Sequence, residues 1–246
     1  MVAIISALKD EICGILKKTV LLSVTGEKSW KLYKVNYKSK QILLLQSGIG
    51  KENVIPSVSY LLDKHQISKI VSLGFAGALR DDLKPGDLIL YSQLFTKNNP
   101  EIIRPDLNLF SSINSIMNSK NSTFHFYKGN SFTSDHILYK PDQKRRYKDR
   151  YGCIAVDMES YWIAYMSRER KVPFVCVRAI SDTLRQRIPK IENWFGTNGK
   201  LNIVEMLKYL AGNPADFLPL FSLWKNAHHA KKSLTTLFAS TIDMLH

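Results

Sequence analysis

Four apolar runs constrain the fold of this chain more than any other feature of its sequence. They are VAIISAL (2–8), QILLLQSGIG (41–50), SKIVSLGFAGAL (68–79) and VPFVCVRAISD (172–182). Runs of this length and composition are typical of strands that are buried on both faces of a sheet. Segments with helical spacing, such as 52–65 and the later part of 153–171, lie between them. The alternation predicts an α/β fold, a single domain with a central twisted mixed β-sheet flanked by helices.

Weaker patterns complete this outline. Alternating or β-rich segments predict further strands at 31–39, 85–95 and 124–132. The segment LFSSINSIMNS (109–119) predicts a helix, and the charged segment 140–152 predicts a polar helix or a loop. Loops are expected at NNPEIIRP (98–105) and at 183–199.

The length of the chain favours one domain with an appended tail. The 246 residues are 45% hydrophobic, which is enough for one sizeable core. We assign residues 1–212 to the α/β domain and residues 213–246 to a C-terminal amphipathic helical extension. Apolar residues of this extension recur at helical spacing at positions 217, 220, 221, 224, 234, 237, 238, 242 and 245. The pattern predicts a helix that packs on the domain or on a partner.

The charge of the chain indicates an acidic partner or surface. A net charge of +14 is compatible with nucleic acid, an anionic membrane or a phosphorylated substrate, and also with a solvated basic surface. The charge alone indicates nucleic acid and no recognised nucleic-acid-binding motif accompanies it, so nucleic acid is not expected as a partner. The three cysteines have no CxxC spacing, which predicts reduced thiols in a cytoplasmic protein and no metal site.

Polar groups stand at the ends of several predicted strands. Glu11 follows the first run, and later ends carry SGIGK (47–51), GFAGAL (74–79), VDMES (156–160) and Ser181–Asp182. Ligands of open α/β sheets bind beyond the carboxyl ends of the strands, so these groups are candidates for one pocket. Structural alternatives exist for each acid. Glu11 is also suited to a helix N-terminus, and Glu159 and Asp182 to helix caps.

The order of these segments resembles one known family. ALKDE (7–11), SGIGK, LGFAGAL followed by PGD, VDMES and VRAISD occur in the order and spacing of the purine nucleoside phosphorylase/nucleosidase superfamily. The resemblance covers roughly residues 1–185. It is nearest to the methylthioadenosine/S-adenosylhomocysteine nucleosidases and to the hopanoid-associated nucleoside phosphorylases. The segments GFAGAL, VDMES and PFxxxRAISD (173–182) look nearer to the hopanoid branch, as does the Trp- and Lys-containing C-terminal helix.

The resemblance implies two catalytic residues. Glu11 matches the carboxylate that orients the attacking water, and Asp182 matches the acid that serves N7 of the purine, with Ser181 as its hydrogen-bond partner. Cleavage of an N-glycosidic bond builds positive charge on the sugar and negative charge on the leaving base. Asp182 must therefore hold a proton near neutral pH, which requires an apolar site or a negative neighbour.

The resemblance also implies a binding site for the nucleoside. Glu159 matches the acceptor for the ribose hydroxyls and Met158 packs beneath the sugar, while Ile137 and Leu138 match residues that line the base pocket. No metal or cofactor is implied, and phosphate is the one candidate co-substrate. A purine nucleoside is the expected substrate, and relatives imply a homodimer or a higher homo-oligomer.

The main prediction is an enzyme that hydrolyses the N-glycosidic bond of a purine nucleoside, a 5′-modified adenosine, and releases adenine. Two alternatives remain open. Phe75 stands where relatives often carry a small hydroxyl residue, and no arginine precedes Arg80. Both features reduce the means to bind phosphate and favour water. Phosphorolysis of a lipid-linked (hopanoid) adenosine and a non-catalytic nucleoside-binding protein are the alternatives. A basic, Trp-containing tail would give the former a peripheral membrane contact.

Overall fold

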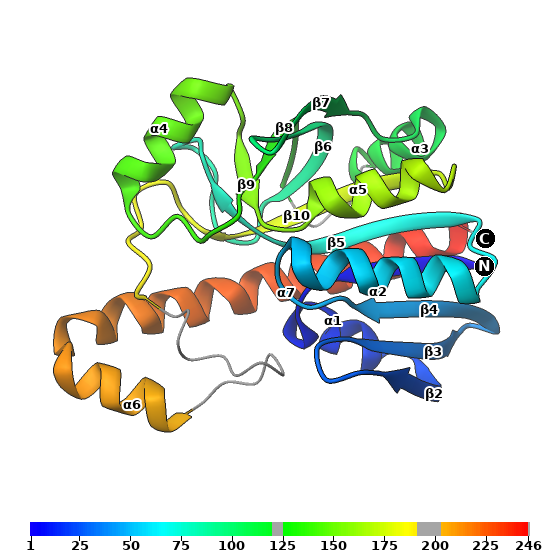
Figure 1. Ribbon diagram of the computed structural model, residues 1–246, viewed down its shortest axis with the longest axis horizontal. Helices are drawn as coiled ribbons and strands as arrows, with labels where there is room; N and C mark the ends of the chain where they lie inside the picture. Colours follow the sequence, from blue (N-terminus) through cyan, green and yellow to red (C-terminus); the bar gives the residue numbers. More distant parts are fainter. Residues whose placement is uncertain (120–124, 191–202, 246) are drawn as a thin grey trace.

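The computed structural model describes residues 1–119, 125–190 and 203–245. One sheet runs through the molecule with helices on both of its faces (Figure 1). The strands are β1 (Val2–Ser6), β2 (Val20–Gly26), β3 (Lys31–Tyr37), β4 (Lys40–Gln46), β5 (Lys69–Ala78), β6 (Leu88–Thr96), β7 (Asn99–Ile103), β8 (Phe126–Thr133), β9 (Ala155–Asp157) and β10 (Phe174–Asp182). The helices are α1 (Lys9–Leu16), α2 (Lys51–Lys64), α3 (Leu107–Met117), α4 (Pro141–Tyr151), α5 (Ser160–Glu169), α6 (Ile203–Gly212), the 3₁₀ turn η2 (Pro214–Asp216) and α7 (Phe217–Leu245).

The sheet has a mixed topology that closes on itself at one side. Its strand order is β10-β6-β8-β9-β5-β1-β4-β3-β2, and β10 also pairs with β5. The strands β1, β4, β5 and β10 are parallel to their neighbours within this group, whereas β2–β3, β3–β4 and β9–β5 are antiparallel. Because β5 is paired with β1, β9 and β10, its carboxyl end lies at the junction of the open and closed parts.

Two apolar clusters cover the two faces of the sheet. Helices α2 and α5 pack on one face, where Val58 and Ile163 are buried. Helices α1, α3 and α7 pack on the other, where Ile12, Ile113 and Leu234 are buried. Strand β10 is buried at all nine of its positions because it has covered neighbours on both faces and both edges. These layers account for the apolar runs from which strands were predicted.

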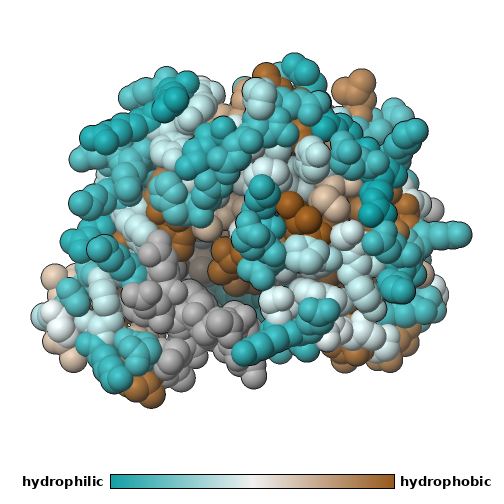
Figure 2. All heavy atoms as spheres, in the orientation of Figure 1, coloured by the Kyte–Doolittle hydropathy of each residue, from teal (hydrophilic) through white to brown (hydrophobic). Residues whose placement is uncertain are grey.

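The C-terminal extension has two different parts. Residues Ala230, Leu234 and Phe238 of α7 belong to the core cluster on one face of the sheet. The first turns of α7 and helix α6 instead leave large apolar side chains exposed. Apolar surface is visible over these elements at the lower left of Figure 2. The exposed residues are Val204, Leu207, Phe217, Leu218, Phe221 and Trp224.

The predicted fold class is confirmed, with several local differences. Residues 99–103 were expected in a loop but form β7, which pairs with β6. Strand β2 was not anticipated because all seven of its residues are exposed at the sheet edge, so its sequence carries no burial pattern. The glycines of GFAGAL lie inside β5 rather than in a turn. The expected loop at 183–199 lies partly outside the described residues.

Candidate active site

The register of two central strands brings the predicted site residues to one edge of the sheet. In the parallel pair of β5 and β10, Arg178 lies opposite Gly74 and Asp182 lies opposite Gly77. Glu11 reaches this edge from the first turn of α1, which follows β1. Glu159 reaches it from the junction of β9 and α5. Segments far apart in the sequence are therefore brought to the second half of β5, near the carboxyl ends of the central parallel strands, where α/β sheets bind ligands.

Glu11 joins α1 to strand β5. One carboxylate oxygen accepts a hydrogen bond from the backbone N–H of Leu8 at 2.8 Å, and the other accepts one from the backbone N–H of Phe75 at 2.7 Å. The first bond is the helix-end role that the sequence allowed, and the second ties the side chain to the sheet. Burial raises the pKa of Glu11, and these backbone donors and Arg178 oppose the rise.

Glu159 is bound from another element and does not cap its own helix. Its carboxylate accepts a hydrogen bond from the backbone N–H of Gly50 at 2.9 Å. Burial, followed by the nearby charges of Asp157 and Glu11, raises the pKa of Glu159 to about 8.

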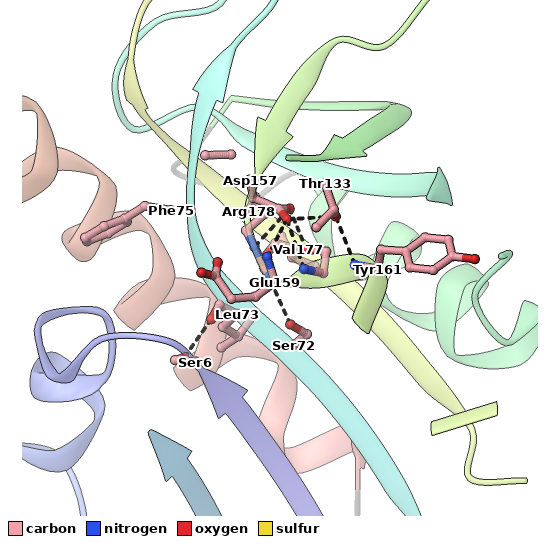
Figure 3. A network of polar contacts seen from close by, with 12 residues as sticks. Ser6, Ser72, Leu73, Phe75, Thr133, Asp157, Glu159, Tyr161, Val177 and Arg178 are labelled. Atoms are coloured by element: carbon pink, nitrogen blue, oxygen red, sulfur yellow. Dashed lines mark hydrogen bonds and ion pairs between the residues drawn. The ribbon is translucent and has the colours of Figure 1, made fainter. Parts of the chain in front are cut away.

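Asp157 caps α5 and forms a buried ion pair. It accepts hydrogen bonds from Thr133 and from the backbone N–H and hydroxyl of Ser160. Nε of Arg178 lies 3.5 Å from Oδ2 of Asp157, and another guanidinium nitrogen donates to Ser72 at 2.9 Å (Figure 3). Arg178 was not predicted as a site residue, although a charge in the middle of the apolar run 172–182 was a visible signal.

Asp182 lies beside Gly77, farther along β5 than Gly74, and has a cation next to it. The hydroxyl of Ser181 donates to Oδ1 of Asp182 at 3.0 Å, which confirms the predicted pairing. Oδ2 forms an ion pair with Nζ of Lys144, which also donates to the carbonyl oxygen of Thr183 at 2.7 Å. The expected apolar site or negative neighbour is therefore wrong: the immediate partner is positive. Lys144 was missed because it belongs to a polar segment with no apolar pattern.

Two glycines of β5 make room for the carboxylates. A Cβ atom on Gly74 would stand 2.9 Å from a carboxylate oxygen of Glu11 and 3.3 Å from Nε of Arg178. A Cβ atom on Gly77 would stand 2.8 Å from Oδ2 of Asp182. The two positions are three steps apart along the strand, or roughly 10 Å. The glycines of GFAGAL thus allow two acidic side chains to lie close to the strand, and they do not form a phosphate-binding loop.

A cleft of about 450 Å³ opens beside Glu159. Gly50 and Met158, which flank Glu159 in space and in sequence, both line it. The ammonium of Lys51 lies 4.4 Å from the ring centroid of Trp162 in the same wall. The other lining residues are Ile49, Glu52, Asn53, Asn98, Ser134 and Asp135. The cleft has both polar and apolar walls.

Three other predicted residues are placed by the structure, and of these Phe75 contacts Glu11. Phe75 meets Glu11 through its backbone, while its ring packs against the apolar cluster and points away from Arg178 and Glu159 (Figure 3). Leu138 is buried in a small apolar cluster with Val156. Ile137 is half-buried. Their roles in binding a base stay predictions.

Comparison with known proteins identifies the family. The sequence profile of the Phosphorylase superfamily matches residues 1–198, most of the chain. The chain therefore belongs to this superfamily, as the order of its strand-end segments predicted.

Individual relatives are nucleosidases. The 5′-methylthioadenosine/S-adenosylhomocysteine nucleosidase of Staphylococcus haemolyticus is 27% identical over 198 residues, which cover 74% of this chain and 86% of the relative. The fold is similar to that of futalosine hydrolase of Helicobacter pylori (TM-score 0.77, 19% identity, 99% of this chain and 97% of the other). It is also similar to a 5′-methylthioadenosine/S-adenosylhomocysteine nucleosidase of Neisseria meningitidis (TM-score 0.76, 17% identity, 98% and 97%). The finer likeness to the hopanoid branch stays a prediction.

Within the described ranges, no helix combines the length and apolar character needed to cross a bilayer. Among the same residues, no group of three or more His, Cys, Asp or Glu side chains is arranged to hold a metal ion.

Proposed function

We propose that this protein hydrolyses the N-glycosidic bond of a 5′-modified adenosine and releases adenine. Three buried acids, each less than 9% exposed, support the proposal. The charge of Glu11 acts on Glu159, and Glu11 and Asp182 lie against two glycines of the same strand, β5. Burying three acidic side chains destabilises a fold unless they are hydrogen-bonded, paired with a positive charge or used to bind a ligand. We call Glu11 and Glu159 the sugar end of the site, and Asp182 with Lys144 the base end.

The sugar end is suited to a ribosyl cation and a nucleophilic water. As the bond to the base breaks, positive charge grows on the ribose, and a nearby carboxylate stabilises it. The raised pKa of Glu11 makes its carboxylate a better base toward an attacking water. We assign Glu159 to accept hydrogen bonds from the vicinal ribose hydroxyls, and Met158 in the adjoining cleft would pack beneath the sugar.

The base end is suited to the leaving group. Adenine departs with its electrons, so a proton at N7 lowers the barrier. Asp182 has one oxygen bound by Ser181 and one bound by Lys144, and we assign it to N7. Ile137 and Leu138 follow β8 in the chain and are proposed to line the base pocket.

The contacts of Arg178 favour water over phosphate as the nucleophile. Arg178 is 2% exposed and is already engaged by Asp157 and Ser72, so it is not free to bind a phosphate. The buried carboxylate of Glu11 would in addition repel such an anion. Phosphorolysis remains the alternative that the experiment below distinguishes.

A second copy of the chain is the proposed partner. The exposed apolar residues of α6 and early α7 lie in segment 203–226, whose charges are Glu205, Lys208, Asp216 and Lys225 and so cancel. In a chain of charge +14, a neutral apolar surface is where two copies meet with the least repulsion. An anionic membrane would instead favour a basic surface. Sedimentation with and without anionic vesicles separates these partners.

The activity is tested by adenine release. The protein is incubated with adenosine, 5′-methylthioadenosine, S-adenosylhomocysteine and adenosylhopane, each with and without phosphate. Release that does not depend on phosphate is expected for at least one 5′-modified nucleoside. Glu11→Gln, which removes the base but keeps the shape, is expected to abolish most of it. Release only with phosphate would identify a phosphorylase, and binding without any release would identify a nucleoside-binding protein.

A further inference from the structure

Lys144 is a buried lysine whose position is unusual for the helix that carries it. Helix α4 has the sequence PDQKRRYKDRY, and Lys144 is its one fully buried residue, at 1% exposure. The side chain enters the base end, where Nζ contacts Oδ2 of Asp182 and the carbonyl oxygen of Thr183. Both partners are acceptors, so the ammonium form of the lysine satisfies the geometry.

This arrangement poses a problem for the assigned acid. An ion pair between Lys144 and Asp182 places the proton on the lysine nitrogen, and the carboxylate alone has none to give to a purine. A buried pair is also a poor source of stability, because well-packed apolar residues of similar volume do as well or better. The ammonium group is, however, the nearest described proton donor to the oxygen of Asp182 that lies against β5.

We propose that Lys144 is the positioning residue that stores the proton for the leaving base and passes it through Asp182. The inference rests on the proposed nucleoside cleavage. As the C1′–N9 bond breaks, its electron pair moves into the purine and makes N7 basic. Asp182 gives a proton to N7 and takes one from the ammonium of Lys144, so the lysine ends neutral.

The balance is completed at the sugar end. Water bonds to C1′ and loses a proton to the carboxylate of Glu11. One proton has then left Lys144 and one has reached Glu11, and exchange through solvent returns both groups to their starting state. The products are the free sugar and neutral adenine, and no further reactant is required.

The test compares two leaving groups in two variants. The wild type, Lys144→Met and Lys144→Arg are assayed with the best nucleoside substrate and with 4-nitrophenyl β-D-ribofuranoside, whose nitrophenolate leaves without a proton. Lys144→Met is expected to lower kcat for the nucleoside about 100-fold or more and to change cleavage of the nitrophenyl riboside by less than about threefold. Lys144→Arg keeps a cation but cannot release a proton. We expect it to be as slow as Lys144→Met on the nucleoside.

Controls separate this inference from a structural role and from the proposed function. Arg146→Met removes an exposed cation from the same helix and is expected to match the wild type on both substrates. In an Asp182→Asn background, Lys144→Met is expected to cause no further loss on the nucleoside. Near-normal nucleoside turnover in Lys144→Met or Lys144→Arg, or an equal loss on both substrates, would overturn the inference. A wild type that cleaves no nucleoside would overturn the proposed function itself.

Discussion

At the sugar end, Glu11 and Glu159 are held mainly by backbone N–H groups, from Leu8, Phe75 and Gly50. At the base end, Asp182 is held by side chains, a hydroxyl and a buried ammonium. Burial raises the pKa of both sugar-end acids, and neither forms an ion pair within the described part of the chain. The carboxyl groups at the two ends of the proposed site are therefore in opposite electrostatic environments.

This difference matches the charges that form when a glycosidic bond breaks. Neutral N–H donors leave acceptor capacity on the sugar-end carboxyl groups, which in the proposed reaction face hydroxyls, water and a ribosyl cation. In the same proposed reaction, the cation at the base end instead faces a leaving group that gains electrons. The following predictions test whether the two ends are separate in function.

The largest expected effect is at the base end. Asp182→Asn is expected to lower nucleoside cleavage about 10²–10⁴-fold, because the proton path to N7 is lost. The amide oxygen can still accept from Lys144, so the fold should persist. Adenine release and thermal unfolding measure the two properties. Nucleoside turnover near that of the wild type would show that the base end has no acid.

The buried ion pair between Arg178 and Asp157 is expected to stabilise the fold near the sugar end. Arg178→Met leaves Asp157 buried without its cation and is expected to lower the free energy of unfolding by about 3–5 kcal/mol. Denaturant unfolding provides the measurement. Arg178→Met combined with Asp157→Asn should recover part of the loss, and no recovery would mean that the two residues act independently.

The sugar end is also expected to make stability depend on pH. The folded protein holds a proton on Glu159 up to about pH 8, whereas the unfolded chain loses it near the ordinary glutamate value of 4.5. The stabilisation is therefore complete below about pH 4.5 and is lost as pH rises toward 8, by about 1.4 kcal/mol per unit. Unfolding between pH 5 and 8 checks this. Glu159→Gln should flatten the dependence, and an unchanged slope would contradict the assignment.

The smallest effects are expected at the two glycines. Gly74→Ala presses on Glu11 and Gly77→Ala presses on Asp182, and each is expected to cost about 1–3 kcal/mol of stability. Gly74→Ala should slow both a nucleoside and a nitrophenyl riboside, whereas Gly77→Ala should slow only the nucleoside. Gly212→Ala is the matched control, because nothing lies within 4 Å of its added Cβ. Identical profiles for the first two variants would remove the distinction between the ends.

Much of this site could be read from particular residues. Glu11, Glu159 and Asp182 follow apolar runs, and parallel strands bring such ends together. The pairing of Ser181 with Asp182 follows from their adjacency. Lys144 could not be found in this way, because its partner is 38 positions away and its own segment is uniformly polar. The two unpredicted strands, β2 and β7, lie at exposed edges where burial leaves no pattern.

The sequence by itself determined the α/β architecture, the superfamily and the order of the strand-end acids, because apolar runs and short segments are local properties of the chain. The tertiary structure decided which charges meet. Burial turned Glu159 into a weak acid, and the register of β5 and β10 placed glycines against carboxylates. Electrostatic character depends on neighbours in space and on the exclusion of water, and neither is encoded at a single position.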